Sequence, residues 1–276
     1  MVSGRVRRTA AIAGGLALSG GAVIAYAQSD KPPPCTPQTN TGGLVMCALD
    51  QEKGDRSLTI NRAAQAGATD QVFVYNQSRS ALDVTVNARQ WTQGANGVAI
   101  PKRRGSLGGV SVDAQTFELA PGARKELKVT LNSVPSSGYV YGALEVVGLP
   151  ADLETRKGVV TGYRLVNSLR YGPATAKAAI KVGAAKVVGK GKARALTLAV
   201  RNTGNTLDPV SGSVKLKSAL GTKNVSVQPI RILPGKNVNL SLMSGNSLKA
   251  GKYTATISLT QAKKKTTATK KITVRR

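Results

Sequence analysis

The sequence predicts an all-β protein: two tandem β-sandwich domains that follow a signal peptide. Short runs with apolar residues at every second position recur along the chain, separated by turn residues, as half-buried strands require. Two Pro-Gly turns, at Pro121-Gly122 and Pro234-Gly235, open similar stretches. In each stretch a glycine, Gly138 or Gly251, stands seventeen residues after the proline. We interpret this repeated spacing as one β-module present twice.

The amino terminus, Met1 to Ala27, has the three parts of a secretory signal. Three arginines between Arg5 and Arg8 form a basic head, Ala10 to Ile24 is a small-residue apolar run, and Ala25 to Ala27 offers an A-x-A cleavage site. An uncleaved anchor is the alternative, but the run is short of the roughly 20 strongly apolar residues that a span needs. We therefore expect a secreted or extracytoplasmic cell-envelope protein with no transmembrane span after signal removal.

The segment from residue 28 to residue 51 is predicted to be a Pro-rich lead-in. It contains Cys35 and Cys47, the two cysteines of the chain, and we expect an exported protein to pair them in a disulfide. Residues 52–173 form the predicted first sandwich and residues 174–276 the second. A break at Gly172-Pro173 precedes the expected junction.

In the first module, the alternation predicts seven short strands with turns between them, which fits an immunoglobulin-like sandwich. A polar insertion from Gly94 to Gly109 interrupts them. The expected strands begin around Leu58 and Ile60 and continue at Val72–Tyr75, Leu82–Trp91, Val110–Leu119, Leu127–Leu131, Tyr139–Val147 and Val159–Leu169.

The second module repeats this plan in a shorter form. Asn202 occupies the place of Asn76, and the interval from the asparagine to the Pro-Gly turn is thirty-two residues instead of forty-five. The first copy therefore carries an insertion of thirteen residues. The expected strands of the second copy are Ile180–Val188, Ala193–Arg201, Val210–Ser218, Val225–Ile232, Val238–Leu242, Tyr253–Leu259 and Thr267–Val274.

Positive charge is concentrated in the second module. The formal net charge is +27, and residues 177–276 hold twenty-one basic residues and one acid, Asp208, against sixteen basic and twelve acidic residues in 28–176. Such a field attracts polyanions. Because of the export signal we expect a cell-wall polyanion or peptidoglycan and not nucleic acid, although the charge could also simply solubilise exposed strands. The candidate polyanion-binding residues are Lys263, Lys264, Lys265, Lys270, Lys271, Arg275 and Arg276.

The chain lacks histidine, which removes the commonest general base and the usual exported zinc and copper sites. Its carboxylates, including Asp113, Glu118 and Glu126, stand in no recognisable catalytic motif. No phosphate-binding glycine loop is present either. We therefore predict a protein that is not an enzyme and that carries no cofactor and no metal site.

Two aromatic positions have alternative interpretations. Trp91 could be a solvent-facing platform for a sugar, but its position at the end of the third strand favours the core tryptophan of a sandwich. Tyr253 in Gly251-Lys-Tyr253 resembles a tyrosine corner, in which the hydroxyl bonds nearby backbone. In the first copy the equivalent tyrosine, Tyr139 or Tyr141, stays ambiguous.

Several short motifs of the first module resemble a PapD-like immunoglobulin domain. They are Phe73 to Asn76, the strand that ends in Trp91, Phe117 to Gly122, and Gly138 to Val147. Such domains occur in periplasmic pilus chaperones and in the peptidoglycan-binding half of bacterial WxL-type surface proteins. The resemblance covers roughly residues 57–173. The second module is similar to the accessory Ig-like domains of exported bacterial surface proteins.

Two functions follow from the resemblance. The first is a secreted, non-catalytic envelope protein that binds cell-wall polymer or another surface protein. The alternative is a periplasmic pilus-type chaperone that acts by strand donation. For a chaperone, the resemblance implies two basic residues in the cleft between the domains, and the nearest matches are Arg62 and Arg170.

Overall fold

The computed structural model describes residues 43–49, 56–57 and 59–275. All the described residues belong to one compact unit. Within them the elements are β-strands, apart from two single-turn 3₁₀ helices, and no helix is long and apolar enough to cross a bilayer. The predicted signal peptide lies outside the described residues.

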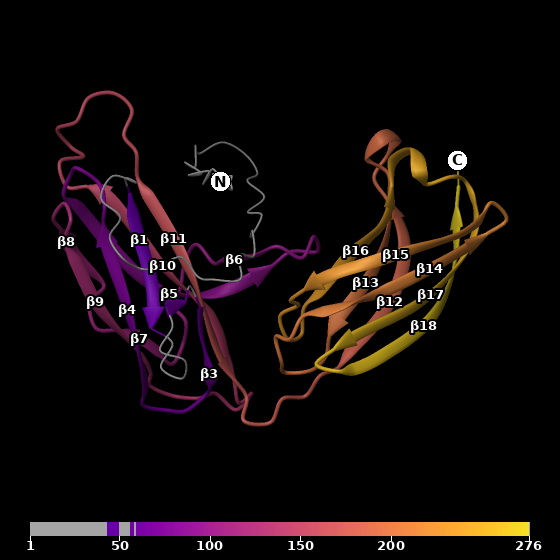
Figure 1. The fold of residues 1–276 in the computed structure, drawn as a ribbon, viewed down its shortest axis with the longest axis horizontal. Coiled ribbons are helices and arrows are strands. Elements are labelled where there is room, and N and C mark those ends of the chain that lie inside the picture. The colour runs from indigo at the N-terminus through magenta and orange to yellow at the C-terminus, as the bar shows by residue number, and fades with distance from the viewer. Residues whose placement is uncertain (1–42, 50–55, 58, 276) are drawn as a thin grey trace, which may run out of the picture. The chain divides into compact units, whose positions relative to one another are not determined.

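The first sandwich contains eleven described strands in two sheets (Figure 1). One sheet has the order β2-β1-β4-β9-β7, and the other has the order β3-β11-β10-β5-β6, with β8 also paired to β5. The bounds are β1 Leu44–Leu49, β2 Arg56–Ser57, β3 Thr59–Ala63, β4 Ala68–Asn76, β5 Leu82–Gln93, β6 Ala99–Pro101, β7 Val110–Val112, β8 Thr116–Leu119, β9 Arg124–Leu131, β10 Val140–Pro150 and β11 Tyr163–Gly172.

The second sandwich is smaller, with a sheet of order β12-β13-β16 opposite a sheet of order β15-β14-β17-β18. A 3₁₀ turn, η1 (Gly191–Ala193), follows β12, and another, η2 (Gly245–Ser247), follows β16. The strands are β12 Ile180–Val188, β13 Ala195–Asn202, β14 Val210–Ser218, β15 Gly221–Ile230, β16 Asn237–Ser244, β17 Gly251–Gln261 and β18 Lys264–Val274. The all-β prediction with two tandem sandwiches is confirmed.

Each sandwich has its own hydrophobic core. In β5, Leu82, Val84 and Val86 are buried while the residues between them face away from the core. The second core is built the same way, for example by Val214 and Leu216 of β14. The alternation read in the sequence therefore sets which face of each sheet is buried.

Three predictions about the first module need correction. The lead-in contains a strand, β1, because Leu44, Met46 and Ala48 alternate and pack in the core. The expected strand Val110–Leu119 is two strands in different sheets, β7 on β9 and β8 on β5. The polar insertion is also not all loop, since β6 pairs with the end of β5.

The same asparagine clamp closes both sandwiches. The Asn76 amide nitrogen donates to the carbonyls of Ser80 (2.8 Å) and Leu119 (2.7 Å), and its oxygen accepts from the Ser78 N–H (2.9 Å). The Pro-Gly turn returns to it, because the Gly122 N–H donates to the Asn76 carbonyl at 2.8 Å.

Asn202 repeats the clamp at equivalent positions. Its amide nitrogen donates to Thr206 (2.8 Å) and Ile232 (2.7 Å), its oxygen accepts from the Gly204 N–H (2.9 Å), and the Gly235 N–H donates to its carbonyl (2.8 Å). The two asparagines are 1 % and 0 % exposed. The aligned positions Asn76 and Asn202 thus have one structural role.

We predict that Asn76→Ala and Asn202→Ala each lower the free energy of unfolding by about 2–4 kcal/mol, because each leaves two carbonyls without their buried donor. Urea denaturation followed by circular dichroism measures the change. Asn224→Ala, on an exposed position of β15, is the control and should change stability by less than about 0.5 kcal/mol. Equal stability of clamp and control variants would contradict the role of the clamp.

Candidate binding surfaces

Strand β11 has an edge that is only partly covered. On one side, β10 pairs with it from Tyr163 to Tyr171. On the other side, β3 runs parallel to it and pairs only with Ser168 to Gly172. Among the described strands, none pairs with this side of Tyr163–Asn167. Within the described part of the chain, the backbone N–H and C=O groups that point to this side have no strand partner, as at the edge of a sheet.

Apolar side chains are exposed in and beside the connection from β10 to β11. Val159 in this loop is fully exposed, and Leu153 in the loop and Leu149 near the end of β10 are 39 % and 40 % exposed. The sequence placed Val159 inside a strand that reaches Leu169. The structure corrects this, because β11 begins at Tyr163 and the loop before it turns through Gly158, which has a φ of 91°. Exposed apolar residues beside an open edge are typical of interaction surfaces.

The open segment also lacks the lysines that usually protect a sheet edge. Edge strands β12 and β18 carry Lys186 and Lys271, which are charges of the protective kind. Between Tyr163 and Asn167 the one charged residue is Arg164, and it is engaged, since its Nε donates to Glu145 at 2.7 Å. Arg89 donates to the other oxygen of the same carboxylate at 3.2 Å.

Asn167, at the end of the open segment, faces the core and is 0 % exposed. Neither its amide nitrogen nor its amide oxygen has a hydrogen-bond partner among the described residues. A buried polar group without a partner destabilises its surroundings by about 1–3 kcal/mol.

Arg62 and Arg170 do not form the predicted pair. In the parallel register of β3 and β11, Arg62 is opposite Tyr171, whose side chain is in the core, so Arg62 faces inward. Arg170 is the neighbour of Tyr171 and faces outward, beside Tyr141 of β10. The two guanidinium groups leave the sheet on opposite faces and cannot bind one carboxylate together.

Arg62 instead neutralises a buried acid. Its Nη1 lies 3.3 Å from Oδ1 of Asp70, which is 4 % exposed, and the hydroxyl of Tyr171 donates to Oδ2 of Asp70 at 3.0 Å. Burial, followed by the charge of Asp70, raises the pKa of the Tyr171 phenol well above its ordinary value. The phenol therefore stays a donor to Asp70, and the network is structural.

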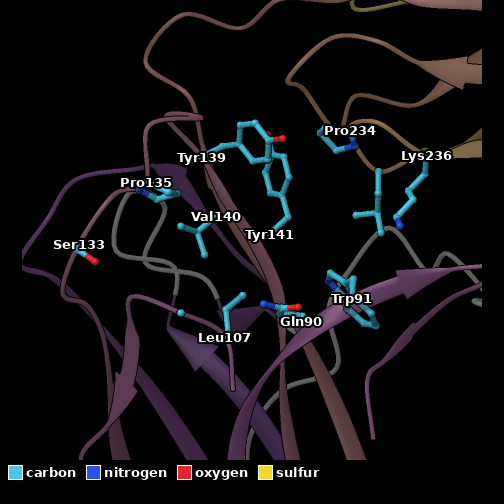
Figure 2. A pocket seen from close by; sticks show the side chains of 12 residues that line it. Gln90, Trp91, Leu107, Ser133, Pro135, Tyr139, Val140, Tyr141, Pro234 and Lys236 are labelled. Carbon is cyan, nitrogen blue, oxygen red and sulfur yellow. The ribbon is translucent and has the colours of Figure 1, made fainter. Parts of the chain in front are cut away.

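Trp91 is not a core residue, contrary to the sequence prediction. It is half-buried and lines a pocket with a volume of about 430 Å³, which Figure 2 shows with Trp91 on one wall and the tyrosine pair on another. The rings of Tyr139 and Tyr141 stack with centroids 4.8 Å apart. Pro234 and Lys236 of the second sandwich complete the lining. No carboxylate is among the described residues that line the pocket, so it offers no acid–base pair of the glycosidase type.

The tyrosines divide between two roles. The Tyr253 hydroxyl donates to the Lys249 carbonyl at 2.9 Å, which is the predicted tyrosine corner. The Tyr141 hydroxyl donates instead to the Asn205 carbonyl of the second sandwich, also at 2.9 Å. Burial, then the neighbouring Tyr139 and the charge of Asp208, raise the pKa of Tyr141 to about 12.

The predicted polyanion residues separate into two groups. Lys263 is at the β17–β18 turn, where its φ of 67° fits a tight hairpin, and Lys264 and Lys265 begin β18. Lys271 lies seven residues beyond Lys264 in this strand, about 23 Å away by strand rise, and Arg275 directly follows the end of the strand. Lys270 points to the face opposite Lys271, and Arg276 is outside the described residues.

Cys47 lies in β1, is 2 % exposed and is disulfide-bonded. Cys35, the other cysteine, lies outside the described residues. The predicted Cys35–Cys47 clip would therefore attach the segment before β1 to a strand of the first sheet, and the pairing itself remains a prediction.

No family model matches the chain, and no curated protein is similar to it. Solved structures similar to it include a chain of a chaperone–tip adhesin complex of CFA/I fimbriae biogenesis, with 13 % identity, a TM-score of 0.47 and coverage of 83 % of this chain and 99 % of that chain.

The class 5 fimbriae chaperone CfaA has 16 % identity, a TM-score of 0.44 and coverages of 83 % and 99 %. A chain of the CsuC–CsuE chaperone–tip adhesion subunit complex of Acinetobacter baumannii has 15 % identity, a TM-score of 0.44 and coverages of 76 % and 94 %. Similarities at this level do not place the chain in that class of chaperones.

We predict that Arg62→Ala lowers the free energy of unfolding by about 2–4 kcal/mol, because it leaves the buried Asp70 without its counter-ion. Arg170→Ala, on the adjacent strand but on the outer face, should cost less than about 1 kcal/mol. Urea denaturation of both variants checks the difference. Two equally small losses would mean that Asp70 needs no counter-ion.

Proposed function

We propose that the protein is a non-catalytic, extracytoplasmic binding protein that holds another envelope protein by β-strand addition along the open edge of β11. This is the function of a pilus-type chaperone, the second of the two functions that the sequence suggests. The observation that carries the proposal is the unpaired side of Tyr163–Asn167, beside the exposed side chain of Val159.

The proposed partner is an extended segment with alternating apolar residues. Its backbone would bond to the open side of β11, which supplies affinity without regard to sequence. On one face of the extended sheet its side chains would lie next to Tyr163 and Leu165, which pack at the margin of the first core. On the loop side they would meet Val159. Burial of apolar surface there would add about 25 cal/mol per Å².

The partly satisfied β11 segment suits a reversible holder. The Asn167 amide, which has no hydrogen-bond partner among the described residues, would be free to bond to a group that an incoming strand brings close to it. The ion pairs of Glu145 with Arg89 and Arg164 hold the outer face of β10, β5 and β11 together while that happens. These ion pairs would keep β5, β10 and β11 paired while a partner strand binds to the free side of β11.

We predict that Val159→Lys and Leu153→Lys each reduce the recovery of bound envelope protein at least tenfold, because a lysine at the edge must be desolvated by an incoming strand. The measurement is the amount of partner that co-purifies with tagged protein produced in its own host. Leu220→Lys is the control, since Leu220 is 72 % exposed in the turn between β14 and β15.

Recovery unchanged in the Val159 and Leu153 variants, or reduced equally by Leu220→Lys, would contradict strand addition at β11. Thermal melting of all three variants shows whether the fold is intact. Because each side chain is exposed, all three should melt within a few degrees of the unchanged protein.

A further inference from the structure

The second sandwich has a groove lined by residues from its edge strands β12 and β18, which are labelled in Figure 1, and from the turn at η1. Its volume is about 690 Å³. Ala185 and Val187 of β12 and Ile272 of β18 line it with apolar side chains, and Ile272 is 7 % exposed. The groove is thus a feature of one folded domain and is independent of the first sandwich.

Five basic residues line the groove, and they come from both of its sides. Lys186 lies on β12, Lys190 and Arg194 flank η1, and Lys271 and Arg275 belong to the carboxyl end of β18. Only Lys271 and Arg275 were recognisable from the clustering of basic residues at the carboxyl terminus. The other three are at least seventy-seven positions earlier in the sequence, and the fold brings them to the same place.

The turn that presents Lys190 and Arg194 is geometrically constrained. Gly189 has a φ of 76°, and a Cβ at this position would stand 2.4 Å from the Ala193 carbonyl, so only glycine fits. Arg194 donates from Nη2 to the carbonyl of Arg275, which ties η1 to the end of β18. The two sides of the groove are therefore connected at one end.

Among the described residues, no acidic side chain lines the groove or forms an ion pair with these five basic residues. Asp208 is the one acid of the second module, and it binds the Thr206 hydroxyl at 2.6 Å. The Gln261 side chain donates to the Asp208 carbonyl, which places Asp208 at the far end of β17 from Thr254, the partner of Lys271. Seven residues of strand separate these ends, about 23 Å, beyond a Debye length of about 8–10 Å.

The arrangement suits an anionic chain better than a single anion. Lys271 and Arg275 are four positions apart at the end of one edge, and Lys186 and Lys190 lie on either side of the Gly189 turn on the other. The Lys271–Arg275 interval corresponds to about 13 Å of extended strand, a length that suits several phosphates better than one. None of the described residues that line the groove is aromatic, so none offers a ring on which a nucleobase could stack, which disfavours single-stranded nucleic acid.

We propose that the β12–β18 groove binds a linear phosphate-bearing polymer, with Lys186, Lys190, Arg194, Lys271 and Arg275 contacting successive anionic groups. This site is separate from the open edge of β11 and goes beyond the proposed function. It would retain the protein on an anionic polymer through the second sandwich while the first holds its partner.

The test uses the full chain and long-chain inorganic polyphosphate, titrated at several salt concentrations by fluorescence anisotropy. The variant Lys186→Gln/Lys190→Gln/Lys271→Gln should weaken binding at least tenfold. It should also make the plot of log K against log salt concentration less steep by about 2, because a complex with three fewer phosphate contacts releases fewer counterions when it forms. All three side chains are exposed, so the fold should be unchanged by circular dichroism.

The matched control removes the same charge from the other end of β18, as Lys263→Gln/Lys264→Gln/Lys265→Gln. The proposal predicts that this variant loses less than threefold in affinity. Equal losses in the two variants would overturn it, because net charge alone would then explain binding. It would also be overturned by orthophosphate binding as tightly as the polymer, or by a single-stranded oligonucleotide binding tenfold more tightly than polyphosphate.

Discussion

A buried asparagine side chain holds each sandwich closed at one end. An asparagine that ends a strand, Asn76 in β4 or Asn202 in β13, bonds two carbonyls far apart in the sequence and receives the Pro-Gly turn on its own carbonyl. With the amide carbonyls buried, water cannot replace these bonds. The clamp fixes where the chain returns to the end of the strand, whatever the length of chain in between.

Because both copies keep the clamp, they can differ elsewhere. The thirteen extra residues of the first copy lie between the asparagine and its turn, in the region that supplies β6 and the Leu107 wall of the aromatic pocket. The second copy is shorter, and its edge strands β12 and β18 carry exposed lysines. One edge that is free of lysine and another lined with it imply different partners for the two domains.

The sequence predicted the periodic features of the fold and missed those set by register. Alternation is a local property, so the strands, the duplication and the Tyr253 corner were accessible from the sequence. The placement of Arg62 and Arg170 was not, since a one-residue offset between neighbouring strands sends side chains to opposite faces. Trp91 was misplaced for a related reason, because β5 continues past it and presents it to the pocket.

The candidate sites were harder to predict than the fold. The open edge of β11 depends on where β3 stops pairing, which no local pattern encodes. The basic groove combines Lys186 with Lys271, which only the fold brings together. The run Lys263–Lys265, predicted from the sequence to bind a polyanion, lies at the other end of β18. Residues that form a site across strand edges are recognised only once the strand order is known.

Hydrogen exchange of the β11 amides in the isolated complex with its envelope partner tests the central claim most directly. Strand addition would give the amides of Tyr163–Asn167 that point away from β10 a new acceptor, so their exchange should slow at least tenfold on binding. The amides of Ser168–Gly172, already covered by β3, should change little. Unchanged exchange across Tyr163–Asn167 in a complex that is otherwise intact would contradict the claim.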